Sequence, residues 1–354
     1  MKQIRTQDAV GHILCHDITQ IVKDVVKDAA FRKGHVVTEE DIPVLLSLGK
    51  DNLFVWEKQQ GMLHENEAAE ILFDICAGEN MIPSEIKEGK IEVIADCDGL
   101  LLVDIKRLYE INRLGEMMIA TRHGGFAVKK GDKLAGTRVI PLIIDQKKMD
   151  RAKAIGGGKP LLTLRPFIKR KAGIIITGNE VYHKRIKDAF SPVLEKKLAE
   201  YGAGAFEKAT LPDKPDEITA CILSMIRNGA ELVICTGGMS VDPDDRTPLA
   251  IRNTGAEVVS YGAPALPGSM FMLAYYNGKI PILGLPGSVM YAERTIFDIV
   301  LPRLIADELI TAGELAAFGP GGLCLNCKMC IFPNCGFGKG VLVSNGTADV
   351  SQPV

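Results

Sequence analysis

The second half of the sequence predicts an α/β fold, a doubly wound and mostly parallel sheet, and the first half predicts a mixed α+β region. The chain has 354 residues, of which 47% are hydrophobic, so it can bury the cores of two or three domains. Beyond residue 165, apolar strand-like runs alternate with helical ones, which is typical of a parallel sheet covered on both faces. Three successive glycines, Gly156, Gly157 and Gly158, precede this change and indicate a hinge or linker.

Residues 1–60 are expected to form a small α+β segment. Thr38 is followed three positions later by the acidic Asp41 and then by the apolar run 42–48, a pattern typical of a helix N-terminus. Gly49 can end that helix. A strand at 53–56 should follow it.

Residues 61–165 are expected to form a second mixed α+β domain. Asp98 and Gly99 lie between two apolar runs, and this dipeptide favours the positive φ angles of a tight hairpin. We therefore expect the two flanking strands to pair with each other. The expected elements are helices at 65–77 and 105–118, strands at 91–97 and 100–105, and two short strands within 128–144 around Gly131 and Asp132.

Residues 166–312 carry the alternation that predicts the parallel sheet. Strands are expected at 173–176, 203–209, 231–235, 257–260 and 281–283. Helices are expected from Ser191, with Pro192 in the first turn, at 215–228 and at 289–305. In such sheets ligands bind beyond the carboxyl ends of the strands, so the loops that follow the strands are where a site should lie.

Two of these loops have an unusual composition. The first loop follows the strand at 173–176 and contains Thr177, Gly178 and Glu180; its glycine allows close backbone approach and its glutamate places a carboxylate at the rim. The Gly-Gly loop, residues 236–247, follows the strand at 231–235. Its glycines can turn successive backbone N–H groups toward an anion, and its hydroxyl residues add donors, which suits a phosphate. The residues meant are Thr236, Gly237, Gly238 and Ser240.

The Gly-Gly loop also carries three carboxylates, Asp242, Asp244 and Asp245. These would repel a phosphate directly and are best explained as oxygen ligands of a bridging Mg²⁺. A third loop, the last loop at 284–288, is built from small residues and opens the final helix. A lone Gly-Gly can be only a strand-to-helix turn, but three such loops at strand ends of one sheet favour a ligand site.

The three loops together resemble a known family. Ile-Thr-Gly-Asn-Glu, Thr-Gly-Gly-Met-Ser-Val-Asp-Pro-Asp-Asp-Arg-Thr and Gly-Leu-Pro-Gly are similar to the pterin-binding domain of the molybdopterin molybdenumtransferases (molybdenum insertases) and of the sibling molybdopterin adenylyltransferases. The resemblance covers residues 170–310. It extends only loosely to the first half, in the segment 31–35 that precedes a short acidic helix.

The resemblance implies molybdopterin, or its adenylylated form, as ligand and a transferase reaction that uses Mg²⁺ and molybdate. The essential aspartate of the family falls on Asp245, and its acidic position in the first loop falls on Glu180; both are the expected catalytic residues. The expected pterin-binding residues are Thr177, Gly178, Thr236, Gly237, Gly238, Ser240, Thr247, Pro286, Gly287 and Ser288.

The departures from the family pattern leave two functions open. The family's Pro-Gly-Lys-Pro stretch reads here Pro267, Gly268, Ser269, Met270, and Ser288 stands where the family has asparagine. The missing lysine affects the binding of molybdate, because a cation is needed to hold molybdate beside the phosphate of the pterin. The chain is therefore either an insertase-like transferase or a non-catalytic carrier or redox sensor of molybdopterin or the finished cofactor, with nucleotide hydrolysis a more distant third.

Charge and hydropathy restrict the other partners. The net charge of −2 without a basic block argues against nucleic acid as a partner. No apolar run is long enough to span a bilayer, and the N-terminal residues lack the apolar core of a signal peptide, so we expect a cytoplasmic protein without a membrane contact. The oligomeric state, including a homo-oligomer, is left open.

Nine cysteines in a cytoplasmic chain require an explanation other than disulfides. Five are scattered through apolar surroundings and are expected to be small buried hydrophobes. The other four lie within twelve residues, in a segment at 313–340 that precedes a tail at 341–354; they are Cys324, Cys327, Cys330 and Cys335.

The spacing of these four, C-x2-C-x2-C-x4-C, predicts a metal centre. Zinc sites commonly use two separated C-x2-C pairs, whereas this run resembles that of bacterial ferredoxins. A [4Fe–4S] cluster is therefore favoured over Zn²⁺, with unliganded thiols as the remaining alternative. A cluster would suggest a redox sensor or an electron-transfer contact with a molybdenum enzyme.

Overall fold

The computed structural model describes residues 2–22, 26–55, 61–240, 242 and 245–340. Trp56, Asp244 and the tail at 341–354, which figure in the predictions above, lie outside the described residues. The chain separates into two compact units and crosses between them more than once. Unit 1 comprises Met1–Asp96, Asp104–Arg122 and Gly131–Thr163, and unit 2 comprises Cys97–Val103, His123–Lys130 and Leu164–Val354.

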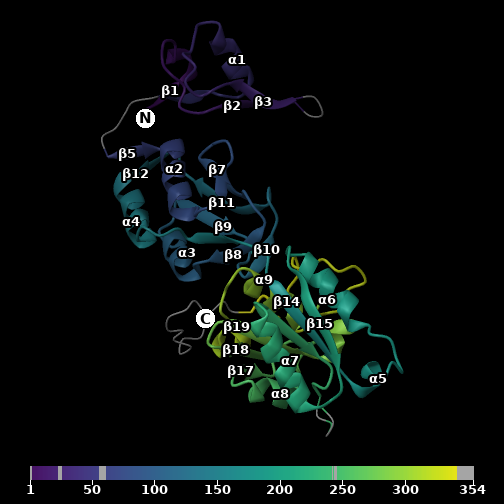
Figure 1. Cartoon of the computed structure of the whole chain (residues 1–354). Helices are drawn as coiled ribbons and strands as arrows, with labels where there is room; N and C mark the ends of the chain where they lie inside the picture. Colours follow the sequence, from purple (N-terminus) through teal and green to yellow (C-terminus); the bar gives the residue numbers. More distant parts are fainter. Residues whose placement is uncertain (1, 23–25, 56–60, 241, 243–244, 341–354) are drawn as a thin grey trace. The chain divides into compact units, whose positions relative to one another are not determined.

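Unit 2 is built around a six-stranded sheet with the strand order β15-β14-β16-β19-β18-β17 (Figure 1). β14, β15, β16 and β19 are parallel neighbours, and β18 is antiparallel to both strands beside it. The α/β prediction with a mostly parallel sheet is confirmed. The strands are β14 (Lys171–Thr177), β15 (Gly204–Leu211), β16 (Leu232–Thr236), β17 (Glu257–Tyr261), β18 (Met272–Tyr276) and β19 (Ile280–Leu285).

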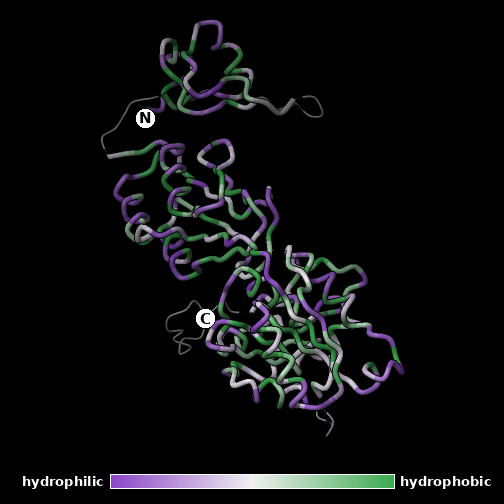
Figure 2. Tube along the Cα trace, in the orientation of Figure 1, coloured by the Kyte–Doolittle hydropathy of each residue, from purple (hydrophilic) through white to green (hydrophobic). Residues whose placement is uncertain are grey.

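Helices cover both faces of this sheet. Successive residues of β14 enter different cores: Ile174 and Ile176 belong to one cluster and Ile175 to the other. α6 and α9 supply the first cluster, and α7 and α8 supply the second. Hydrophobic residues accordingly follow the central strands in Figure 2. The helices of this unit are α5 (Asn179–Tyr182), α6 (Phe190–Ala199), α7 (Pro215–Arg227), α8 (Thr247–Asn253), the 3-10 helix η2 (Gly287–Met290), α9 (Ile296–Ile305) and α10 (Ala312–Ala316).

Two expectations for unit 2 were wrong in extent. β18 was not predicted as a strand, although all but the last of its residues are buried. The single helix expected at 289–305 is divided into η2 and α9. The break has a local cause, because Thr295 caps α9 with its side chain and Asp298 returns a bond to the Thr295 backbone, which is the capping box of a new helix start.

Unit 1 consists of short helices and several small sheets, as the α+β prediction requires. Its largest sheet has the order β6-β7-β11-β9. The strands are β1 (Lys2–Arg5), β2 (Ile18–Val22), β3 (Val26–Phe31), β4 (Asn52–Val55), β5 (Met62–His64), β6 (Met81–Pro83), β7 (Lys90–Ala95), β9 (Met117–Thr121), β11 (Lys133–Val139) and β12 (Ile143–Asp145). The helices are η1 (Thr6–Asp8), α1 (Asp41–Ser47), α2 (Glu65–Cys76), α3 (Ile105–Asn112) and α4 (Gln146–Gly156).

The hairpin expected around Asp98 and Gly99 is wrong. β7 pairs with β6 and β11, whereas β8 (Gly99–Val103) pairs with β10 (Phe126–Val128) in a separate sheet with β13 (Leu162–Pro166). Gly99 is required for another reason, since an added Cβ would lie 2.4 Å from the Arg165 carbonyl oxygen. A close strand contact, and not a turn, therefore selects this glycine.

The helix expected at 105–118 ends early, and the glycines at 156–158 have a defined role. α3 stops at Asn112, whose side-chain amide forms hydrogen bonds with both backbone groups of Ile119 and so starts β9. Gly156 is the last residue of α4, which was not predicted, and Gly157 caps this helix with a backbone in the left-handed region.

Among the described residues, no helix is long and apolar enough to cross a membrane.

Candidate functional site

The first loop, the Gly-Gly loop and the last loop follow three adjacent strands of the unit 2 sheet. β14, β16 and β19 are parallel neighbours, so their carboxyl ends lie at one edge. Thr177 and Thr236 end their strands, and Leu285 ends β19. The sequence prediction that these loops share an edge is therefore confirmed by the topology.

Three threonine hydroxyls connect the loops to one another. Thr177 Oγ1 lies 3.0 Å from Thr247 Oγ1, and Thr247 donates to the Gly237 carbonyl oxygen at 2.8 Å. Thr236 donates to the Leu285 carbonyl oxygen at 3.4 Å. All three side chains are buried. The structure places them behind the loops, where they hold the loop backbones together, and their expected contact with a ligand stays a prediction.

Gly237 and Gly238 have consecutive positive φ angles of 93° and 55°. A Cβ on Gly237 would lie 2.0 Å from the Thr177 carbonyl oxygen, so this residue is glycine because the backbone packs tightly behind it. Among the described residues, the backbone N–H groups of Gly238, Met239 and Ser240 have no backbone acceptor. Consecutive free N–H groups in such a turn form a concave anion site.

These three residues line a cavity of about 490 Å³. The Gly-Gly loop forms one wall through residues 237–240 and Asp245, and the last loop forms another through residues 286–288. The turn at 266–270 and the side chain of Tyr291 complete the lining. Two of the three predicted loops thus converge on one hollow.

Asp245 is the one charged residue in the described lining of this cavity. Its Oδ2 accepts from the Asp242 backbone N–H at 3.1 Å, and its own N–H donates to the Asp242 carbonyl oxygen at 2.9 Å. Asp242 is exposed. Among the described residues, no three His, Cys, Asp or Glu side chains form a group that could hold a metal ion.

The last loop contributes an unsatisfied hydroxyl. Ser288 Oγ is buried and has no hydrogen-bond partner among the described residues, and Ser288 lines the cavity. Gly287 has open space where a Cβ would project, so packing does not require glycine there. Pro286 is buried beneath the loop. An unpaired hydroxyl at a cavity wall is a ready donor for a bound anion.

Glu180 and Gly178 do not line the cavity in the described structure. Glu180 is exposed in the short α5, and its Oε1 lies 2.9 Å from the place of a Cβ on Gly178. The Asn179 N–H donates to Asp213 Oδ2 at 2.9 Å and holds the loop there. The catalytic role expected for Glu180 stays a prediction.

The lining also includes residues that the sequence did not single out as a site. Leu266, Met270 and Tyr291 give the cavity an apolar side, and Met239 adds to it. The turn at 266–270 could have been found, since it stands where the insertase family has Pro-Gly-Lys-Pro. Tyr291 carried no comparable signal, because it lies in the break between η2 and α9 that was expected to be helical.

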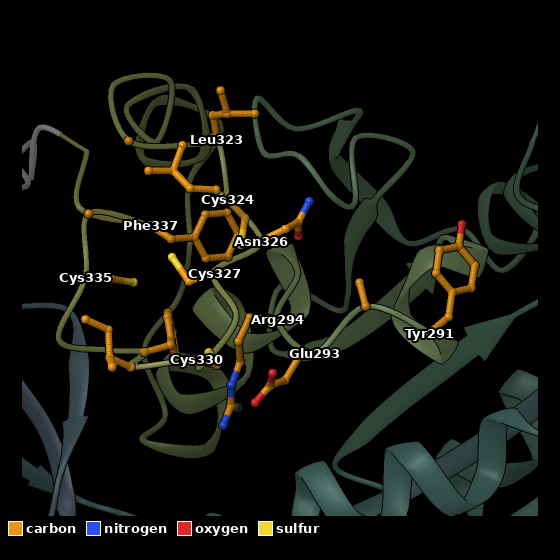
Figure 3. Close-up of a pocket in the computed structure, with 16 residues that line it drawn as sticks. Tyr291, Glu293, Arg294, Leu323, Cys324, Asn326, Cys327, Cys330, Cys335 and Phe337 are labelled. Atoms are coloured by element: carbon orange, nitrogen blue, oxygen red, sulfur yellow. The ribbon is translucent and has the colours of Figure 1, made fainter.

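The four cysteines of the C-terminal segment line a second cavity, of about 480 Å³. Figure 3 shows Cys324, Cys327, Cys330 and Cys335 around this space with Phe337 and Arg294. Cys324 and Cys335 also pack against the main core of unit 2. Phe332 and Phe337 of the same segment also reach that core, so the segment is packed against the rest of the unit.

A match to a family of domains accords with this geometry. Residues 173–306 match the family model described as "Probable molybdopterin binding domain". This part of the chain is similar to the domains of that family. A second match, at residues 3–57, is to a domain of unknown function.

Curated relatives match this chain over a limited length. The CinA-like protein of Mycobacterium tuberculosis is 32% identical over 93 residues, which are 26% of this chain and 22% of that protein. The CinA-like protein of Mycolicibacterium vanbaalenii is 33% identical over 90 residues, 25% of this chain and 21% of that protein. The aligned region is thus about a fifth of the length of these relatives.

Solved structures with some likeness include enzymes of molybdopterin synthesis. The molybdopterin biosynthesis enzyme MoaB from Thermus thermophilus is 24% identical, with 38% of this chain and 91% of that chain covered and a TM-score of 0.32. A molybdenum cofactor biosynthesis protein from Pyrococcus furiosus is 14% identical, with 87% of this chain and 64% of that chain covered and a TM-score of 0.26.

Proposed function

We propose that the cavity at the Gly-Gly loop binds the phosphate end of a pterin, molybdopterin or its adenylylated form. The observation that carries this is that Gly238, Met239 and Ser240, whose N–H groups have no backbone acceptor among the described residues, line the same cavity as Asp245. Backbone N–H groups and the Ser288 hydroxyl supply donors for phosphate oxygens. The domain family of residues 173–306 supports the choice of a pterin over other phosphorylated ligands.

The apolar side of the cavity suits the ring system of the pterin. Leu266, Met270 and Tyr291 line the same cavity as the donors of the Gly-Gly loop and the last loop. A volume of about 490 Å³ lies within the range of about 300–1,000 Å³ for small-molecule sites. The proposed ligand therefore meets polar contacts at one end and apolar contacts along its ring.

Mg²⁺ is the cation that fits the carboxylates at the rim. Asp245 would hold it together with Asp242, and the ligand phosphate would complete the coordination. Such an ion supplies neutralisation of the charge between two anions. The chain itself fixes the position of Asp245 through two hydrogen bonds with Asp242, one accepted by the Asp245 carboxylate and one donated by its backbone N–H.

The reaction we propose is an insertase-like transfer, in which molybdate is placed next to the bound pterin. The residues of this chain act by binding and orientation: the N–H groups hold the phosphate, and Asp245 places the cation beside it. No nucleophile is needed for this chemistry, which depends on electrostatic positioning. The proposal rests on the resemblance of the loops to the insertase family.

A non-catalytic carrier of the pterin is the second candidate, and one observation favours it. The described lining of the cavity contains no lysine, arginine or histidine. Molybdate beside a phosphate calls for a cation that holds the second anion, and Ser269 and Met270 stand where the insertase family has a lysine and a proline. Binding of the pterin survives this change better than insertion does.

Molybdate-dependent turnover separates the two candidates. The full-length protein would be incubated anaerobically with adenylylated molybdopterin, Mg²⁺ and molybdate, and the products analysed by mass spectrometry. Formation of molybdenum-bearing pterin above a protein-free control supports the transferase. Retention of unchanged pterin supports the carrier, and failure to retain any pterin contradicts both.

A further inference from the structure

The four-cysteine segment is a folded part of unit 2. The Leu266 N–H donates to the Gly322 carbonyl oxygen at 2.7 Å, and the Cys324 N–H donates to the Leu266 carbonyl oxygen at 2.8 Å. At the far end, the Gly338 N–H donates to the Gly321 carbonyl oxygen at 2.9 Å. Both ends of the cysteine run are therefore held, and the loop between them has a fixed span.

Close backbone packing reinforces these bonds. A Cβ on Gly322 would lie 2.0 Å from the Pro264 carbonyl oxygen, and one on Gly340 would lie 1.9 Å from that of Ala317. Both glycines are therefore selected by contact with the rest of the unit. A loop fixed in this way presents its cysteines at defined positions before any ligand binds, which is how a binding site is preorganised.

The cysteines surround one space without closing on one another. All four line the cavity of about 480 Å³, yet no three of them form a group that could hold a single ion, among the described residues. Four sulfurs on one zinc, each about 2.3 Å from the metal, would lie within roughly 4 Å of each other. The four thiols would therefore have to move toward a shared metal group to ligate it.

The cavity has an apolar wall and an open side. Phe332 and Phe337 are among its apolar lining residues, whereas Leu323 is 62% exposed. Arg294 also lines it; its guanidinium lies over the Phe332 ring at 5.2 Å, and its Nε is buried without a partner among the described residues. The same guanidinium forms ion pairs with Asp298 at 2.9 Å and Glu200 at 3.1 Å, so its charge is already balanced within the unit.

We propose that Cys324, Cys327, Cys330 and Cys335 bind one [4Fe–4S] cluster in this cavity. Each thiol gives up its proton, and its sulfur forms one bond to one iron of the cluster. The spacing C-x2-C-x2-C-x4-C and the cavity that all four cysteines share support this ligand class. The site is independent of the pterin proposal, and it goes beyond it.

The cluster would lie next to the proposed pterin cavity. Tyr291 lines both cavities, and Leu266, which lines the pterin cavity, is bonded to both Gly322 and Cys324. Ligation of Cys324 would therefore hold one wall of the pterin cavity in place. This arrangement makes the cluster a structural neighbour of the ligand site within the same unit.

The test is anaerobic purification of the full chain, followed by reconstitution with iron and sulfide. Wild-type protein should become brown, with broad visible charge-transfer absorbance and about four irons and four sulfides per chain. Reduction with dithionite should give a paramagnetic signal of a reduced cluster. A colourless protein that holds one zinc, or a protein that takes up neither metal, would overturn the proposal.

Variants locate the cluster and guard against misfolding. Cys327 is exposed and Cys330 is half-buried, so Cys327→Ala and Cys330→Ala should leave the thermal midpoint of the metal-free protein nearly unchanged and abolish the colour. The control is Cys221→Ala, a half-buried cysteine of α7, which should keep the full iron content. Wild-type iron content in the Cys327→Ala, Cys330→Ala double variant would show that these thiols are not the ligands.

Discussion

The hydroxyl oxygens of Thr177 and Thr247 lie 3.0 Å apart, at the junction of β14 and α8. Thr247 donates in addition to the Gly237 carbonyl oxygen at 2.8 Å. One buried hydroxyl thus joins the first loop to both ends of the Gly-Gly loop. The shape of the proposed phosphate site depends on this junction, although neither threonine lines the cavity.

Thr247→Val should loosen the junction while keeping the side-chain shape. It removes the donor to Gly237 and the partner of Thr177, so we expect a loss of about 1–3 kcal/mol in the free energy of unfolding and weaker pterin binding. Thr219→Val is the matched control, because Thr219 donates to the Ala250 carbonyl oxygen away from the cavity. Chemical denaturation and pterin titration measure both effects. Wild-type pterin affinity in Thr247→Val would contradict the account.

Gly237→Ala should destabilise the domain more than Gly229→Ala does. Both glycines have φ near +100°, at 93° and 103°, but only Gly237 has a neighbour, the Thr177 carbonyl oxygen, in the place of the new Cβ. Alanine at either position should lower the free energy of unfolding by about 1–2 kcal/mol, because its backbone is strained in the left-handed region. Gly237→Ala adds the steric clash. Equal thermal midpoints for the two variants would show that the loop backbone can move away from the new Cβ at no cost in stability, which would contradict this prediction.

Asp245→Asn should weaken Mg²⁺-dependent pterin binding by about tenfold or more, which corresponds to about 1.4 kcal/mol. The amide can still accept from the Asp242 N–H, so the loop geometry and the thermal midpoint of the ligand-free protein should change little. Asp216→Asn, on the exposed side of α7, is the control and should bind as the wild type does. Unchanged affinity in Asp245→Asn would remove this residue from the site.

Ser288→Ala should separate ligand binding from stability. The Ser288 hydroxyl is buried without a partner, so its removal should leave the free energy of unfolding unchanged or raise it by up to about 1 kcal/mol. Pterin affinity should fall, because the variant lacks a donor at the cavity wall. A variant that is less stable and binds normally would assign the hydroxyl a structural role.

The parallel sheet could be predicted because each central strand carries its own signal. In β14 and β16, buried residues alternate between two cores, so both read as continuous apolar runs between helices. β18 lacks this alternation of strand and helix, because a short turn at Asn277 and Gly278 joins it directly to β19. Antiparallel additions of this kind are hard to distinguish from loops.

The site was predictable only in part, because contact is a tertiary property. The Gly-Gly loop and the last loop were found from composition, and the sheet brings both to the same cavity. Composition could not reveal that Thr177 and Thr236 are buried behind the loops, nor that Glu180 lies outside the lining. The pairing of β8 with β10 and β13 likewise depends on contacts distant in sequence, which a local turn signal at Asp98 and Gly99 cannot show.

Pterin retention by the purified protein tests the central claim most directly. The full chain and Asp245→Asn would each be mixed anaerobically with molybdopterin and Mg²⁺, passed through a desalting column, and assayed by oxidation of the bound pterin to its fluorescent product. The account predicts close to one pterin per chain for the wild type, a lower amount for Asp245→Asn, and a lower amount for the wild type when Mg²⁺ is chelated. A wild-type protein that emerges without pterin, or equal retention in all three samples, would contradict it.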